Sequence, residues 1–229
     1  MESLVSTDWL AEHLGAPDLA VVDSSWHMPA SGRSGRDEYL AAHVPGARFL
    51  DIDAVSDRAS PAPHMLPSAQ DFGAAMERLG IDRDDRIILY DNSPTRTAAR
   101  GWFMLRHFGA GSVAILDGGF QKWIAEGRPT ERGEPARRPA RFEAVEQPDE
   151  IVTKEQILSG EVLTPILDAR STERFEGSAP DPRAGVEPGH IPGACSLPFA
   201  ALYNPDGTFR APDELRRLFA AADIDPTRP

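Results

Sequence analysis

Asp53 and His64 lie in a stretch, residues 53–70, that has no periodic hydrophobic pattern. A loop of this length inside a compact domain usually has a function or is disordered. A carboxylate that orients an imidazole is an arrangement that moves protons near neutral pH. The two side chains are also ordinary polar groups for a loop surface, so proton transfer and simple solvation both remain possible interpretations.

Arg174 and Arg183 lie in a second loop, which is rich in Gly and Pro. A planar guanidinium binds a planar carboxylate through two parallel hydrogen bonds. The chain has 24 Lys and Arg against 36 Asp and Glu, so its net charge is −12 and its overall field repels anions. An anionic ligand would therefore need a local arginine cluster. The alternative is that both arginines are solvated surface groups.

Cys195 is the only cysteine in the 229 residues. An intramolecular disulfide is therefore excluded, and the composition suits a reducing compartment, for which we predict the cytoplasm. A lone thiol is a candidate nucleophile, but Cys195 falls in an expected strand, where free cysteine commonly acts as a small buried hydrophobe. We predict a structural role for it.

The charge and the hydrophobic pattern also limit the partners. A net charge of −12 argues against non-specific binding to nucleic acid or to an anionic membrane. The first residues lack the basic and apolar regions of a signal peptide, and no apolar run reaches the length of a membrane span. We therefore expect no nucleic-acid or membrane partner.

The elements that must position these residues alternate between strands and helices. Apolar runs at Leu19–Asp23, Ile87–Tyr90 and Val113–Asp117 predict buried strands, and the second of them predicts a central strand. Helical spacing covers Ser68–Leu79 and Thr97–Phe108. This order predicts an α/β fold whose mainly parallel sheet is flanked by helices.

A second copy of the pattern comes later in the chain. His43–Ala47 reads His-Val-Pro-Gly-Ala, and His190–Ala194 reads His-Ile-Pro-Gly-Ala. Asp23 and Asp168 each end an apolar run upstream of these segments. Two matching segments at similar offsets indicate an internal duplication and hence tandem domains. Because the histidines recur in both copies, we expect them to fix the turn rather than to catalyse a reaction.

The repeat sets the expected domain boundaries. Residues 1–135 form the first domain, the Pro-, Glu- and Arg-rich residues 136–150 a linker, and residues 151–229 the second domain. In the second copy Pro229 falls at the position of Arg86, so the counterparts of the central strand and of the later elements would number beyond 229. We expect the second domain to be incomplete here and the natural chain to continue for roughly fifty residues.

Several motifs together resemble one family, the two-domain rhodanese-type sulfurtransferases. The motifs that carry the resemblance are His43–Ala47, Leu116–Phe120 with Trp123, and Glu187–Gly193. Further stretches are closer to the 3-mercaptopyruvate sulfurtransferase branch; these are Phe49–Asp53, Pro63–Pro67, Arg174 with Phe175, and Asp181–Arg183.

This resemblance implies a mechanism and roles for particular residues. A catalytic cysteine takes sulfur from 3-mercaptopyruvate or thiosulfate as a persulfide and passes it to a thiol, cyanide or thioredoxin-like acceptor, with no metal or organic cofactor. Asp91 stands at the cysteine's position in the first domain, which implies that this domain is inactive. The catalytic loop of the second domain would lie beyond residue 229, so we expect these 229 residues alone to be inactive.

The resemblance also implies that Arg174 and Arg183 bind the carboxylate and carbonyl of mercaptopyruvate. It implies that Asp53 and His64 form a relay with a serine of the catalytic loop. The alternative function is a non-catalytic module of the same fold that binds a protein or a sulfur carrier. Phosphatase chemistry also occurs on this fold, but no residue here favours it.

Overall fold

The computed structural model describes residues 1–147, 150–162, 164–182 and 185–225. The chain divides into two compact units, Met1–Ile151 and Val152–Pro229. Each unit is an α/β assembly with a parallel sheet, as the alternation of strands and helices predicted.

Unit 1, Met1–Ile151, contains a five-stranded sheet in which every paired neighbour is parallel. The strands, in order across the sheet, are β1 (Leu4–Val5), β5 (Val113–Leu116), β4 (Arg86–Tyr90), β2 (Leu19–Asp23) and β3 (Arg48–Phe49). The middle strand is β4, and Ile87 to Tyr90 in it are fully buried. The prediction of a central buried strand is therefore confirmed.

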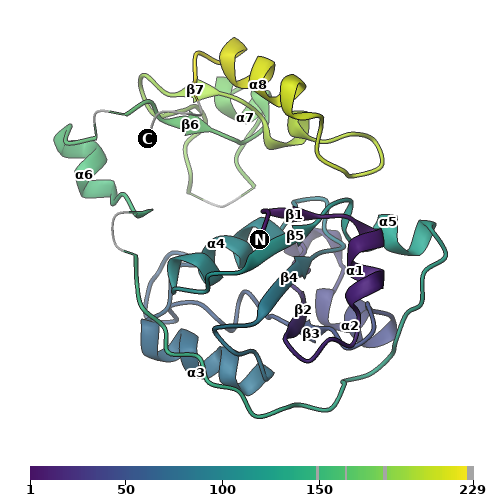
Figure 1. Cartoon of the computed structure of the whole chain (residues 1–229). Coiled ribbons are helices and arrows are strands. Elements are labelled where there is room, and N and C mark those ends of the chain that lie inside the picture. Colours follow the sequence, from purple (N-terminus) through teal and green to yellow (C-terminus); the bar gives the residue numbers. More distant parts are fainter. Residues whose placement is uncertain (148–149, 163, 183–184, 226–229) are drawn as a thin grey trace. The chain divides into compact units, whose positions relative to one another are not determined.

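In the part of unit 1 that the structure describes, five α-helices and the short 3-10 turn η1 surround this sheet. They are α1 (Thr7–His13), the turn η1 (Pro29–Ser31), α2 (Gly35–Ala41), α3 (Ala69–Leu79), α4 (Ala98–His107) and α5 (Gly119–Ala125). Figure 1 shows the strands of unit 1 between α3 and α4 on one side and α1 and α2 on the other.

The strands alternate their side chains between two hydrophobic clusters, one on each face of the sheet. Ile87 and Leu89 of β4 pack with buried residues of α3 and α4, such as Phe72. Ile88 and Tyr90 pack with α1, α2 and α5. Alternate residues of one strand thus anchor both helical layers, which holds the loop after β4 in a fixed place.

Residues 136–147 pack along unit 1, although their composition predicted a linker spanning 136–150. Phe142 is only 2% exposed and its ring lies 5.6 Å from that of Phe72, edge to face. Arg138 pairs with Asp85, and the Val145 N–H donates to the Phe108 carbonyl at 3.1 Å. The boundary between the units therefore lies at Ile151, after the predicted linker. The sequence pattern missed this packing because single residues, and not a periodic run, hold the segment in place.

Unit 2, Val152–Pro229, contains a two-stranded parallel sheet of β6 (Leu167–Asp168) and β7 (Cys195–Ser196). Its helices are α6 (Lys154–Ser159), α7 (Thr172–Glu176) and α8 (Pro212–Ala221), with a 3-10 turn η3 at Phe199–Leu202. In Figure 1 these elements run from green to yellow.

The two small sheets repeat one register. Val22 pairs with Arg48 in unit 1, and Leu167 pairs with Cys195 in unit 2. In the next pair of each sheet, Asp23 and Asp168 occupy the same position. Cys195 therefore stands in the second strand at the place of Arg48, as the sequence repeat predicted.

The two repeated histidines also share one geometry. The Nδ1 atom of His43 lies 2.8 Å from the Tyr39 carbonyl, and the two rings stack with centroids 4.3 Å apart. His190 repeats both contacts with Phe175, at 2.8 Å and 3.8 Å. Each histidine thus ties its Pro-Gly turn to the preceding helical segment.

In the described ranges 1–147, 150–162, 164–182 and 185–225, no helix is long and apolar enough to cross a membrane.

Candidate functional site

Asp53 and His64, the two loop residues that the sequence singled out, meet in unit 1. The His64 Nε2 atom lies 2.7 Å from Asp53 Oδ1. The His64 side chain is 25% exposed and the Asp53 side chain 65%, so the pair is open to solvent. An imidazole held by a carboxylate at the surface can accept a proton and pass it on.

The backbone of His64 is held in an unusual conformation. Its φ is 58°, a left-handed value that residues other than glycine adopt uncommonly. The guanidinium of Arg100, on α4, donates from Nη2 to the His64 carbonyl oxygen at 2.5 Å. Burial lowers the pKa of Arg100. Helix α4 thereby fixes the position from which the imidazole projects, and such constrained residues often lie at functional sites.

Trp26 completes the cluster, and sequence reasoning missed it. Its indole Nε1–H donates to Asp53 Oδ2 at 3.0 Å, and its ring meets the His64 ring edge to face, with centroids 4.9 Å apart. The sequence signal was available but weak. Trp26 lies three residues after the carboxyl end of β2, an edge at which parallel sheets gather functional loops.

Asp91 lies at the carboxyl end of β4, in the loop that leads to α4. Its Oδ1 accepts the Ser93 N–H at 2.9 Å, and its Oδ2 accepts the Ala98 N–H at 2.7 Å. The residue is 6% exposed, and this burial raises its pKa. The carboxylate thus occupies the main-chain N–H groups of its own loop, and a carboxylate cannot form a persulfide.

A charged network borders the same loop. Glu38 accepts hydrogen bonds from Arg33, at 2.7 Å from Nε, and from the Asn92 side chain at 3.0 Å. His27, which is buried, places its Nε2 atom 3.1 Å from the same carboxylate. The Arg33 contact, foremost among these, lowers the pKa of Glu38. This network fixes the Asn92 side of the loop.

Arg174 lies in α7 of unit 2, where its Nη2 pairs with the carboxylate of Asp181. That carboxylate is 4% exposed, and Arg170 also approaches it, at 3.8 Å. The Nε atom of Arg174 is buried, and it has no hydrogen-bond partner among the described residues. Any anion that binds Arg174 must therefore share this guanidinium with Asp181. Arg183 lies outside the described residues.

Cys195 is a free, partly buried thiol in β7. Within the described residues, no group of three or more His, Cys, Asp or Glu side chains could hold a metal ion.

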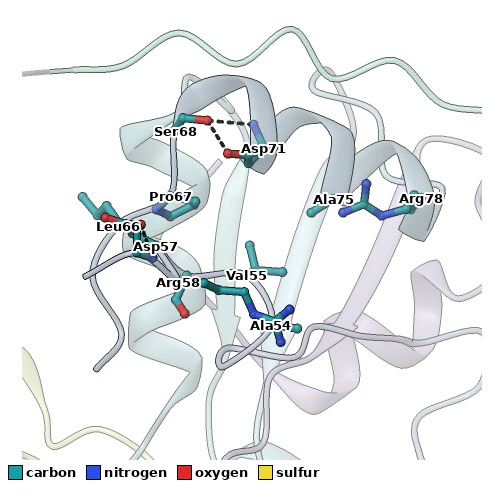
Figure 2. A pocket seen from close by; sticks show the side chains of 12 residues that line it. Ala54, Val55, Asp57, Arg58, Leu66, Pro67, Ser68, Asp71, Ala75 and Arg78 are labelled. Atoms are coloured by element: carbon teal, nitrogen blue, oxygen red, sulfur yellow. Dashed lines mark hydrogen bonds between the residues drawn. The ribbon is translucent and has the colours of Figure 1, made fainter. Parts of the chain in front are cut away.

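A separate pocket of about 630 Å³ lies between the loop at residues 54–68 and α3. Figure 2 shows its lining, in which Ser68 and Asp71 are joined by hydrogen bonds at the start of the helix. Arg58 and Arg78 also line it, together with Asp57. Asp53 and His64 do not line this pocket, so it is distinct from their cluster.

Comparison with known proteins places this geometry in a family. A family model described as a rhodanese-like domain matches residues 6–126. The 3-mercaptopyruvate sulfurtransferase of Mus musculus is 40% identical over 99% of this chain and 79% of its own length. The thiosulfate sulfurtransferase of Bos taurus gives the same identity and coverage.

A solved structure agrees with the sequence relatives. The crystal structure of SseA from Escherichia coli, described as a 3-mercaptopyruvate sulfotransferase of rhodanese fold, superposes with a TM-score of 0.90 at 36% identity. The match covers 100% of this chain and 87% of SseA. The chain therefore belongs to the rhodanese family of sulfurtransferases.

Proposed function

We propose that this sulfurtransferase uses 3-mercaptopyruvate as its preferred donor and that Asp53 and His64 handle the proton of that reaction. The observation that carries the proposal is the 2.7 Å contact between His64 Nε2 and Asp53 Oδ1. The 3-mercaptopyruvate sulfurtransferase of Mus musculus and the thiosulfate sulfurtransferase of Bos taurus share the same identity and coverage with this chain, so the donor is argued from chemistry.

The two donors differ in their need for a proton relay. When a cysteine thiolate attacks the thiol sulfur of 3-mercaptopyruvate, the S–C bond breaks and its electrons pass to the enolate of pyruvate. The thiol proton must leave the sulfur, and the enolate carbon must gain a proton. When the same thiolate attacks thiosulfate, sulfite departs with the S–S electrons and no proton moves. A histidine near the donor therefore serves only the first reaction.

Arg174 and Arg183 supply the anion-binding part of the proposal. A carboxylate on a protein of charge −12 needs a local positive field, and arginine suits a planar carboxylate. The Nε of Arg174 is buried and lacks a partner within residues 1–147, 150–162, 164–182 and 185–225. This supports the role, because a bound oxyanion next to the guanidinium would compensate its desolvation.

In this proposal a cysteine carries the sulfur. It stands in the second copy at the position that corresponds to Asp91 in the first copy. Cys195 is excluded from that role in the proposal, because it sits inside β7 at the place of Arg48. The acceptor is a thiol, cyanide or a thioredoxin-like protein, and the single cysteine favours the cytoplasm as the location.

The test compares both donors in the full-length enzyme. His64→Asn should lower kcat/KM for 3-mercaptopyruvate by about 100-fold, the contribution of a general acid–base group. The same variant should leave thiosulfate within about twofold, since no proton transfer is needed. His13→Asn is the matched control, because His13 lies on α1 and contacts Trp9 instead. An equal loss with both donors would overturn the relay.

A further inference from the structure

Trp26 joins the Asp53–His64 pair to the loop that comes after the central strand. The loop, defined here as residues 91–97, holds the Trp26 backbone at both of its polar groups. The Trp26 N–H donates to Thr97 Oγ1 at 3.2 Å, and the Ser93 hydroxyl donates to the Trp26 carbonyl at 2.6 Å. Thr97 Oγ1 itself donates to the Ser24 carbonyl at 2.8 Å, so the anchor is shared with a second residue of the same segment.

The side chain of Trp26, in contrast to its backbone, contacts the Asp53–His64 pair itself. Its Nε1–H donates to Asp53 Oδ2 at 3.0 Å and leaves Oδ1 for His64. The indole and imidazole planes cross at 87°. Both carboxylate oxygens thus have a partner, and the ring of Trp26 limits the rotation of the imidazole. A carboxylate fixed at both oxygens orients an imidazole better than one held at a single oxygen.

Asp91 gives the loop its shape. Its carboxylate closes the loop by accepting the N–H groups of Ser93 and Ala98, the first just inside the loop and the second at the start of α4. The serine whose backbone Asp91 holds is the same one whose hydroxyl holds Trp26. A continuous set of hydrogen bonds therefore runs from Asp91 through Ser93 and Trp26 to Asp53.

We propose that Trp26 is a positioning residue for the Asp53–His64 pair and that the loop at 91–97, closed by Asp91, is its anchor. The inference rests on the proposed function, since it names the residues that hold the Asp53–His64 pair in place within the same site. It gives the loop of unit 1 a task in the reaction, although Asp91 cannot carry sulfur.

The first experiment measures the indole N–H resonances of the chain by NMR. Of the four tryptophans, Trp26 donates to a carboxylate, whereas Trp102 and Trp123 donate to the backbone carbonyls of Val113 and Pro129. Asp53→Asn should therefore shift the Trp26 resonance and leave the other two in place. A Trp26 resonance that does not respond to this substitution would overturn the hydrogen bond on which the inference depends.

The second experiment measures turnover in the full-length enzyme. Trp26→Phe keeps an aromatic ring beside His64 and removes the donor to Asp53. The variant should lower kcat for 3-mercaptopyruvate about tenfold, the loss expected for one hydrogen bond to a charged group. Thiosulfate turnover should stay within about twofold, because thiosulfate needs no proton relay. Trp9→Phe is the matched control, since Trp9 stacks on His13 and touches neither member of the pair.

The two variants separate the inference from the function on which it rests. If His64→Asn spares the 3-mercaptopyruvate reaction, the relay itself is wrong. If His64→Asn abolishes that reaction and Trp26→Phe leaves it unchanged, the relay stands and the positioning role is overturned. Ser93→Ala tests the anchor, and it should displace the Trp26 indole resonance and lower the same kcat. Ser93→Ala that moves neither would overturn the role of the loop.

Discussion

The guanidinium of Arg100 holds the main-chain carbonyl oxygen of His64 at 2.5 Å. This contact joins a helix of the sheet core to a long surface loop at the residue whose φ is 58°. The contact is to the backbone of His64, so it fixes the position of the main chain that carries the imidazole. It occupies neither ring nitrogen. The loop can therefore keep a constrained histidine while the ring remains available for chemistry.

Arg100→Met should loosen this loop with little cost to global stability. The variant loses one hydrogen bond but also removes a buried charge whose pKa is lowered by desolvation, so the free energy of unfolding should change by less than about 1 kcal/mol. Amide hydrogen exchange should accelerate across residues 60–66. Unchanged protection there would contradict the proposed hold on His64. Arg106→Met, on the same helix but stacked over Trp102, is the control.

Asp23 gives unit 1 a predictable pH dependence. Burial raises the pKa of Asp23 from 3.8 to about 6, so the folded unit binds an extra proton between these values. The contribution of Asp23 to stability is therefore fully present below about pH 4 and is lost as the pH rises through 6. Asp23→Asn removes this contribution while keeping an acceptor for the Ser25 N–H.

The difference in unfolding free energy, variant minus wild type, should therefore rise by roughly 3 kcal/mol between pH 4 and pH 7. Tryptophan fluorescence during urea unfolding measures it, because all four tryptophans lie in unit 1. A difference that is constant across this range would show that Asp23 has an ordinary carboxyl pKa.

Asp91→Ala should destabilise unit 1 by about 2 kcal/mol. The variant leaves the N–H groups of Ser93 and Ala98 in a buried loop without their acceptors, and that loss exceeds the relief from removing a buried carboxylate. Asp51→Ala is the control, since exposed Asp51 accepts the Ala54 N–H at 3.0 Å and should cost less than about 1 kcal/mol. Equal costs for the two variants, measured by urea unfolding, would refute the closure of the loop by Asp91.

Cys195→Ala should leave sulfur transfer within about twofold of the wild type, because a partly buried thiol in a strand acts mainly through packing. Steady-state rates with both donors measure this in the full-length enzyme. Peptide mass spectrometry during turnover provides the second readout. An additional sulfur on Cys195 would assign it the role of carrier and reverse our interpretation.

Arg174→Lys should raise KM for 3-mercaptopyruvate by about tenfold and that for thiosulfate by much less. Lysine keeps the charge that pairs with Asp181 but loses the two-point geometry that suits a carboxylate. Arg216→Lys, on exposed α8, is the control. Equal increases for both donors would indicate general electrostatic attraction instead of carboxylate recognition.

The sequence contained the information for the repeated and apolar parts of the fold. The uninterrupted apolar run Ile87–Tyr90 predicts a strand buried on both faces, and β4 is the middle strand. The repeat predicts that Cys195 replaces Arg48, and both residues occupy the same register position. These features depend on periodicity and spacing, which are local properties of the chain.

The remaining features depend on contacts between distant residues. The edge strand β3 is only the two residues Arg48–Phe49, and its short length follows from its pairing at the sheet edge. Phe142 packs against Phe72 without any periodic pattern around it. Asp53 and His64 were singled out by their residue types, and their 2.7 Å contact fits that choice, while their role stays a prediction. For Trp26 the sequence offered only its place shortly after β2, and its contact with the pair became evident from its indole hydrogen bond.

The carboxylate of Asp91 also determines how the loop at 91–97 responds to its surroundings. Its two oxygens accept the N–H groups of Ser93 and Ala98. Because this acceptor is covalently part of the same segment, these main-chain donors are satisfied without a separate anion from solution. The shape of the loop should therefore be independent of the concentration of phosphate, sulfate or other anions in the buffer.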